Sequence, residues 1–179
     1  MLVGVPQDRV GVVRESLESY LVMEDAETAD ASASTTWFGT HGPDGWEIAK
    51  GVAAAVGGWA AAIDRTGLGG GALAVPRDRA DDAISALASA GATVGDDEAW
   101  ETLRLERGVP RFGVDFDASH YPQEASLERK AVSFKKGCYL GQEVVCRLEM
   151  RGHVKRKLVS LVLSSDSVPE AGADRKSVV

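Results

Sequence analysis

The sequence has no long apolar run and contains few cysteine, histidine or aromatic residues. Its 179 residues include 2 cysteines, 3 histidines and 6% aromatic residues. No apolar stretch approaches the roughly 20 residues that a membrane-spanning helix requires, and the N-terminus lacks the basic region and the apolar core of a secretory signal. These absences exclude the usual membrane-anchored and secreted classes. They predict a cytoplasmic protein without membrane contact.

The two cysteines and three histidines form no recognisable disulfide, metal or hydrolase pattern. Cys138 and Cys146 are separated by about two turns of a predicted helix, which places their Cα atoms on the order of 12 Å apart, beyond disulfide reach. Free thiols of this kind are typical of a reducing compartment. With His153 they match no structural zinc spacing, so no metal site is expected. His41 and His120 have no recognisable Asp or Ser partner, so a Cys-His hydrolase is not predicted.

Two nucleotide-binding patterns are also missing. The glycine cluster at residues 67–71 has no Gly-Lys-Ser/Thr ending and precedes a predicted strand, so it indicates a plain turn instead of a phosphate loop. The tryptophans are expected to be core or rim residues and not a stacking platform. No aromatic residues interleave with the basic ones, and no sequence-specific nucleic-acid binding is predicted. The tryptophans are Trp37, Trp46, Trp59 and Trp100.

Composition and an internal repeat predict a folded α+β protein. The chain is 44% apolar and 26% charged, which suffices for one core of ordinary size or two small ones. Residues 2–10 and 72–80 share Val-Pro-x-Asp-Arg at an offset of 70. Each copy predicts a strand followed by a helix, because Pro6 and Pro76 suit a first helical turn and apolar residues follow at helical spacing. Duplication of a strand–helix module is one explanation, and chance or a shared capping solution is the other.

Turn and capping residues place the other elements. Glycine, proline and capping positions divide the chain into segments of helical or alternating apolar spacing. Gly152 is expected to end the last helix as its C′ residue. The predicted strands are residues 35–40 and 154–163, and the predicted helices are residues 44–57, 96–107 and 141–151.

Residues 135–143, Lys-Lys-Gly-Cys-Tyr-Leu-Gly-Gln-Glu, are the most informative segment of the chain. Cys138 lies behind two lysines and just before a predicted helix, whose N-terminal amides favour a thiolate over a thiol. Gly137 and Gly141 allow unusual backbone conformations and leave room for a ligand. This pattern predicts a reactive or binding thiol. The alternative is a buried cysteine in a tight loop.

The net charge of −7 conceals an uneven distribution. Residues 1–128 carry 9 Lys/Arg against 22 Asp/Glu, whereas residues 129–179 carry 11 against 5. The basic part attracts phosphate, a polyglutamate tail or nucleic acid in one interpretation, and is a solvated mixed surface in the other. The basic residues around the cysteine are Arg129, Lys130, Lys135, Lys136, Arg147, Arg151, Lys155, Arg156 and Lys157.

The segment Lys-Gly-Cys-Tyr-Leu-Gly-Gln-Glu at residues 136–143 resembles the signature of the YgfZ-like branch of the folate-binding family related to the glycine cleavage T-protein. The resemblance continues on both sides, covers essentially the whole chain and is weakest between residues 31 and 67. It implies repeated strand–helix modules followed by a small β-barrel. Residues 1–152 would be the folate-binding region, incomplete at its N-terminus, and residues 153–179 the incomplete start of the barrel. The other matching stretches are residues 104–110, 113–116, 122–125, 132–134 and 147–152.

The resemblance implies a folate-binding accessory protein that supports iron–sulfur cluster assembly or repair and thereby tRNA modification. Its ligand would be tetrahydrofolate or another folate derivative, and its partners iron–sulfur proteins or their assembly factors. Cys138 would be the functional thiol, without a required catalytic role. The alternatives are a tetrahydrofolate-dependent aminomethyltransferase and an inert, truncated gene product. The residues that accompany Cys138 in the signature are Lys136, Gly137, Tyr139, Gly141, Gln142, Glu143 and Arg147.

The resemblance also implies a role for Glu106. This residue matches the pterin-binding acid of the family, which lies in an Arg-x-Glu-x-Gly stretch. A carboxylate can accept two parallel hydrogen bonds from the edge of a pterin ring. Arg107 is a departure, because that position is usually small in the family. Without the resemblance, the pattern indicates a surface carboxylate paired with nearby arginines.

Overall fold

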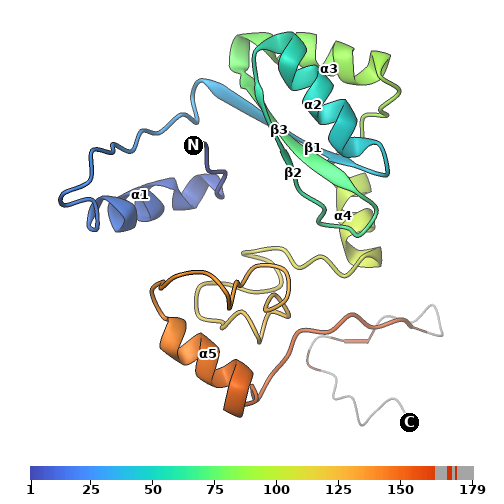
Figure 1. The fold of residues 1–179 in the computed structure, drawn as a ribbon. Helices are drawn as coiled ribbons and strands as arrows, with labels where there is room; N and C mark the ends of the chain where they lie inside the picture. Colours follow the sequence, from blue (N-terminus) through green and yellow to red (C-terminus); the bar gives the residue numbers. More distant parts are fainter. Residues whose placement is uncertain (164–168, 171, 173–179) are drawn as a thin grey trace. The chain divides into compact units, whose positions relative to one another are not determined.

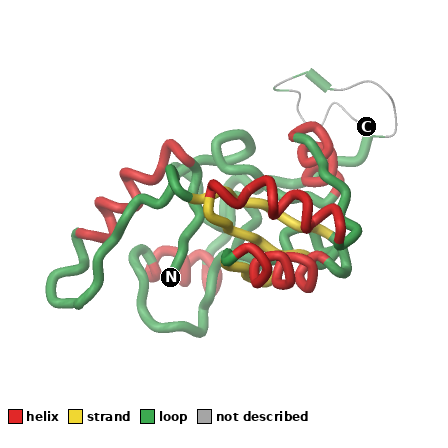
Figure 2. Tube along the Cα trace, turned by 90° about the horizontal axis from the view of Figure 1, so that it is seen from above, coloured by secondary structure: helices red, strands yellow, loops and turns green. Residues whose placement is uncertain are grey.

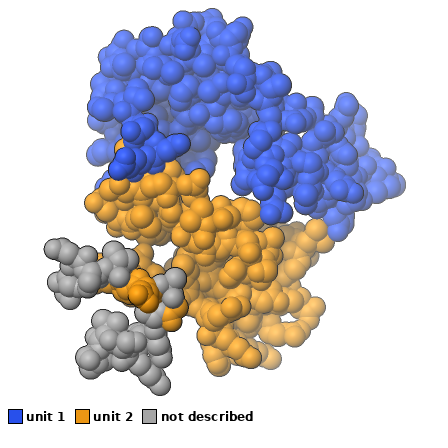
Figure 3. Space-filling model, turned by 180° about the vertical axis from the view of Figure 1, so that it is seen from behind, with its two compact units in different colours: residues 1–98 blue, residues 99–179 orange. Residues whose placement is uncertain are grey.

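The computed structural model describes residues 1–163, 169–170 and 172. The chain divides into two compact units, Met1–Glu98 and Ala99–Val179 (Figure 3). The described residues form a mixed α/β structure with five α-helices and three strands (Figure 1). Among them, no helix combines the length and the apolar character that crossing a membrane requires. The family-based boundary at residue 152 stays a prediction.

The first unit is built on a three-stranded antiparallel sheet. The strands are β1 (Thr35–His41), β2 (Trp59–Ala62) and β3 (Gly70–Pro76), in the order β1-β3-β2. The predicted strand at residues 35–40 and the predicted helix at residues 44–57 are confirmed as β1 and α2 (Gly45–Val56). Figures 1 and 2 show α2 and α3 (Ala80–Ser89) running along this sheet.

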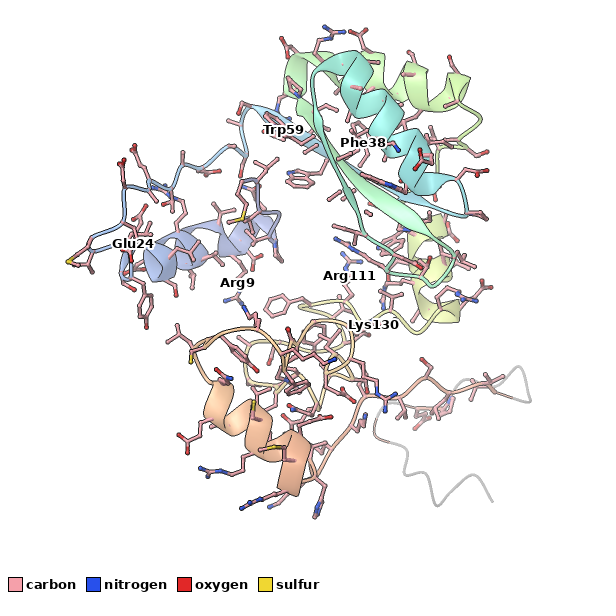
Figure 4. The ribbon with its side chains drawn as sticks, in the orientation of Figure 1. Arg9, Glu24, Phe38, Trp59, Arg111 and Lys130 are labelled. Carbon is pink, nitrogen blue, oxygen red and sulfur yellow. The ribbon has the colours of Figure 1, made fainter. Side chains whose placement is uncertain are left out.

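One face of the sheet packs against these helices. Leu73 and Val75 of β3 are fully buried and lie in one core cluster with apolar residues of α2 and α3. Phe38, directly opposite Leu73 in the sheet, packs against the same cluster (Figure 4). The helix residues of the cluster are Ala49, Val52, Ala53, Val56, Ala83 and Leu87.

Two tryptophans lie on the opposite face of the sheet. Trp37 and Trp59 flank Ala74 across the three strands, and they are 45% and 59% exposed. Successive residues of a strand point to opposite faces, so the alternation that buries Leu73 turns these tryptophans away from α2. Of the two predicted positions, core and rim, this exposure excludes the core for Trp37 and Trp59.

The internal repeat is structural only in its helical half. After Pro6 and after Pro76 a short 3-10 turn leads into a helix, α1 (Val10–Glu18) or α3, and both prolines have φ near −53° and ψ near 140°. In the described chain, residues 2–5 form no strand, so the strand predicted there is wrong. A strand requires a hydrogen-bonded neighbour, and residues 2–5 pair with none of the three strands of the sheet. The duplicated module is therefore not confirmed.

The second unit contains most of α4 (Asp97–Glu106) and all of α5 (Gln142–Arg151). Residues 154–163, all described, form no strand, so the strand predicted there is wrong and the start of a barrel is not confirmed. The physical reason is the bonding of this segment: Leu158 N–H donates to the Glu124 carbonyl over 2.7 Å, and Ser126 Oγ donates to the Leu158 carbonyl over 2.7 Å. The remainder of the predicted barrel region falls largely outside the described residues.

The helix predicted at residues 141–151 is confirmed as α5 (Gln142–Arg151), but the conformation of Gly152 differs from the prediction. Gly141 is the N-cap with φ of 78°, a left-handed conformation that favours glycine. Gly152 has φ of −114° and ψ of 176°, so it is extended and the C′ prediction is wrong. Glycine fits there for another reason: a Cβ at residue 152 would lie 3.1 Å from the Leu148 Cα.

Candidate thiol and carboxylate sites

Cys138 lies in an irregular segment between a bend at residues 134–137 and the start of α5. Its side chain is exposed and its thiol is free. The alternative of a buried cysteine in a tight loop is therefore wrong. Exposure is the first condition for a thiol that binds or reacts with a partner.

Backbone and side-chain bonds fix the chain directly after this thiol. Tyr139 N–H donates to the Gln142 side-chain oxygen over 3.2 Å, and Gln142 N–H donates to the Tyr139 carbonyl over 3.2 Å. One turn later, the exposed side chains of Glu143 and Arg147 form an ion pair. These contacts hold the Tyr139–Gln142 turn as a defined entry into α5.

The Tyr139 side chain is half-buried between a lysine and the second cysteine. The Lys136 ammonium lies 5.4 Å from the centre of the Tyr139 ring. Burial raises the pKa of the Tyr139 hydroxyl, and the neighbouring Cys146 side chain raises it further. Cys146 is itself only partly exposed. Its contact with Tyr139 makes Cys146 a packing residue.

We expect the two thiols to differ strongly in reactivity. Cys138 is exposed beside Lys136, whereas Cys146 packs against Tyr139, so Cys138 should react with iodoacetamide many times faster. Mass spectrometry of labelled peptides over a pH series measures both rates. Equal rates for the two thiols would contradict the prediction.

Glu106 is the last residue of α4 and its side chain is exposed. Within the described part of the chain it makes no hydrogen bond or ion pair, so the alternative of a carboxylate paired with nearby arginines is wrong. The C-terminal end of a helix carries partial negative charge and does not stabilise a carboxylate. Local stability therefore gives no reason for an acid at this position, and both carboxylate oxygens are available to an external donor.

The nearby Arg104 is instead held in a buried ion-pair network. Arg104 is 4% exposed, and its guanidinium lies 2.6 Å from a Glu101 oxygen and 2.7 Å from an Asp115 oxygen. The hydrogen bond to Glu101 is the main cause that raises the pKa of Arg104, and it also lowers the pKa of Glu101. Arg111 N–H donates to the same Asp115 oxygen over 2.8 Å. The network fixes the loop after α4 to the helix that ends at Glu106.

A buried amide connects α5 to the turn at residues 122–125. Gln123 is 6% exposed, and its Nε2 donates to the Val145 carbonyl over 2.9 Å. Buried polar groups need such partners, because an unmade bond costs about 1–3 kcal/mol. Residues 122–125 are one of the stretches that carry the family resemblance, but no local pattern indicated a role for Gln123.

Comparison with curated proteins identifies a relative of this chain. Over 76 residues it is 42% identical to the tRNA-modifying protein YgfZ of Enterobacter sp. (strain 638). Over this region the chain is similar to YgfZ. The aligned region covers 42% of the chain and 23% of the relative, so the chain spans about a quarter of that protein's length. A search with family models finds no match.

The YgfZ-like chain brings together only part of the predicted site. Lys136 and Gln142 each contact Tyr139, the residue that follows Cys138. Within the described residues, no hydrogen bond or ion pair joins Glu106 to this segment. The described residues also contain no group of three or more His, Cys, Asp or Glu side chains that could hold a metal ion.

Asp117, Ser119 and His120 form a polar cluster that was not predicted from the sequence. His120 Nδ1 lies 2.9 Å from an Asp117 oxygen, so the statement that His120 has no Asp or Ser partner is wrong. The Ser119 hydroxyl donates to that same oxygen over 2.6 Å, and it is the main cause that lowers the pKa of Asp117 to about 2. In a catalytic triad the serine and the carboxylate contact opposite nitrogens of the histidine ring. Here the Ser119 hydroxyl lies 3.4 Å from His120 Nδ1, the same nitrogen that contacts Asp117, so the arrangement is not a triad. The i, i+3 spacing of Asp117 and His120 was the available signal.

Proposed function

We propose that this YgfZ-like chain is a folate-binding accessory protein that supports iron–sulfur cluster assembly or repair, and through it tRNA modification. The observation that carries the proposal is the exposed, free thiol of Cys138 within its signature segment. The relative's name, tRNA-modifying protein, supports the last step of the proposal. The protein would work in the cytoplasm, with iron–sulfur proteins or their assembly factors as partners.

The proposed chemistry of Cys138 rests on the properties of a thiolate. A thiolate is a soft ligand for iron–sulfur clusters, a nucleophile and a redox group. Lys135 and Lys136 are exposed on the preceding residues, and their positive charge would attract an anionic partner toward the thiol. In the proposed role, Cys138 is a transient ligand or redox group for a cluster that belongs to the partner protein.

The folate part of the proposal rests on Glu106. Its two oxygens have no partner among the described residues, so they fit the ring N–H and the exocyclic amino group of a pterin. When bound, a reduced folate supplies one-carbon chemistry. The residues of this chain would bind and orient it: Glu106 accepts the hydrogen bonds, and the Arg104 network holds the loop beside the end of α4.

Replacing Glu106 with glutamine is expected to weaken tetrahydrofolate binding by about 1–3 kcal/mol, or roughly 5- to 150-fold. Glutamine keeps one acceptor but turns an amino group toward a pterin donor, which leaves that donor unpaired. Isothermal titration calorimetry measures the affinity. Glu98→Gln is the matched control, because Glu98 is also exposed and lies at the other end of α4. If Glu106→Gln binds with unchanged affinity, Glu106 is not part of the folate site.

A product assay separates the accessory role from that of a tetrahydrofolate-dependent aminomethyltransferase. The purified protein is incubated with tetrahydrofolate and an aminomethyl-loaded carrier protein. The accessory proposal expects no turnover. Release of ammonia together with methylenetetrahydrofolate would replace it with the transferase function.

A further inference from the structure

The residues around Cys138 form a strongly basic region in which every cation is exposed. Residues 129–157 carry nine Lys/Arg and two Glu, an excess of seven positive charges. Each of the nine side chains is exposed. We call these nine residues the basic surface: Arg129, Lys130, Lys135, Lys136, Arg147, Arg151, Lys155, Arg156 and Lys157.

Two contacts bring the end of this region back to its beginning. The Lys157 ammonium lies 2.8 Å from a Glu128 oxygen. Glu128 directly precedes Arg129 in the chain. The Leu158 N–H donates to the Glu124 carbonyl over 2.7 Å. Residues 155–158 therefore run beside residues 124–128, and the cations of the two segments become neighbours.

Two further contacts bring in α5 and the cysteine segment. The Gln123 side chain donates a hydrogen bond to the Val145 carbonyl, so α5 is joined to the turn at residues 122–125. Helix α5 carries Arg147 and Arg151. Tyr139 packs beside Cys146, which joins the Lys135–Lys136 segment to the same helix. Four groups of cations that are separate in the sequence are thus tied to one turn of the second unit.

Few carboxylates oppose this charge locally. Glu128 is used by Lys157, and Glu143 is used by Arg147. Glu124 accepts the Tyr121 N–H over 3.0 Å. Glu149 is the one other carboxylate within residues 129–157. A positive excess therefore remains after these pairs are formed.

We infer that the basic surface binds the phosphate backbone of RNA directly and without sequence preference. Clustered exposed cations release counterions from a polyanion, and this release supplies most of the free energy of non-specific nucleic-acid binding. The choice of RNA over an acidic protein rests on the proposed function in tRNA modification. Cys138 follows Lys136 of the basic surface by two residues, so bound RNA would be near the thiol.

The test measures binding of the full 179-residue chain to a fluorescently labelled, unmodified tRNA transcript. Anisotropy titrations from 50 to 200 mM salt give the slope of log affinity against log salt. About five phosphate contacts would give a slope of roughly −3.5 to −4.5. A slope near zero would overturn the inference, because it would indicate contacts other than ionic ones.

A matched pair of double variants locates the binding surface. Lys155→Glu/Arg156→Glu is expected to weaken binding at every salt concentration and to reduce the slope by about 2, or about 1 per phosphate contact. Lys50→Glu/Arg79→Glu makes the same change in net charge on exposed residues of the first unit, and should leave affinity and slope nearly unchanged. Circular dichroism checks that both variants fold. Equal weakening by both pairs would overturn a localised surface.

Two more measurements separate the other outcomes. Tighter binding of poly-L-glutamate than of tRNA at equal salt would overturn RNA in favour of an acidic polymer. Absence of tRNA binding in a chain that still binds tetrahydrofolate would overturn this inference alone and leave the proposed function standing.

Discussion

Replacing Cys138 with serine is expected to remove most of the cellular function of the gene, whereas Cys146→Ser should retain most of it. Oxygen and sulfur are similar in size, but a hydroxyl supplies no thiolate, no soft-metal ligand and no disulfide chemistry. Cys138 is exposed, so the exchange disturbs no packing there. Cys146 is partly buried against Tyr139 and provides a matched control for the loss of a thiol.

The measurement is complementation of a strain that lacks the gene. The deletion should lower the activity of a cluster-dependent tRNA-modifying enzyme and raise sensitivity to oxidants. The wild-type gene and Cys146→Ser should restore both, and Cys138→Ser should restore little at equal protein level. Full complementation by Cys138→Ser would show that the thiol has no essential chemistry.

The Leu73→Ala substitution should lower the free energy of unfolding by about 2–5 kcal/mol. Leu73 is fully buried at the centre of β3, between strands β1 and β2 and beneath the helices that cover this face. Alanine removes three carbon atoms from a close-packed site, and the cavity that remains adds to the lost apolar burial.

Urea denaturation followed by far-UV circular dichroism gives the two free energies. Leu68→Ala is the control, because Leu68 is 41% exposed and its truncation should cost less than about 1 kcal/mol. Similar losses for Leu68→Ala and Leu73→Ala would contradict the position of the core.

Local signals in the sequence predicted the elements that depend on local interactions. The helix spacing of α2 and α5 and the apolar pattern of β1 required no knowledge of distant residues. The strands predicted at residues 2–5 and 154–163 failed because a strand depends on a partner elsewhere in the chain. At residues 154–163 a side chain and a carbonyl from residues 124–126 supply the bonds instead.

In the candidate sites too, features set by nearby residues were predictable, whereas contacts between distant residues were not. The exposure of Cys138 and the position of Glu106 at the end of a helix follow from nearby residues. The bond from Gln123 to the Val145 carbonyl spans 22 positions, and that from Arg104 to Asp115 spans 11. No spacing rule connects residues so far apart, so these contacts became visible only in the structure.

The fixed position of Tyr139 limits how far the thiol can travel. Two hydrogen bonds of its backbone and a half-buried side chain hold Tyr139 in place, and consecutive Cα atoms are about 3.8 Å apart. The Cα of Cys138 therefore stays within that radius of an anchored neighbour. A thiol held this close to an anchored residue cannot move between two distant binding sites. Any cluster, nucleotide or protein that reacts with it must deliver its own reacting atom to this one place.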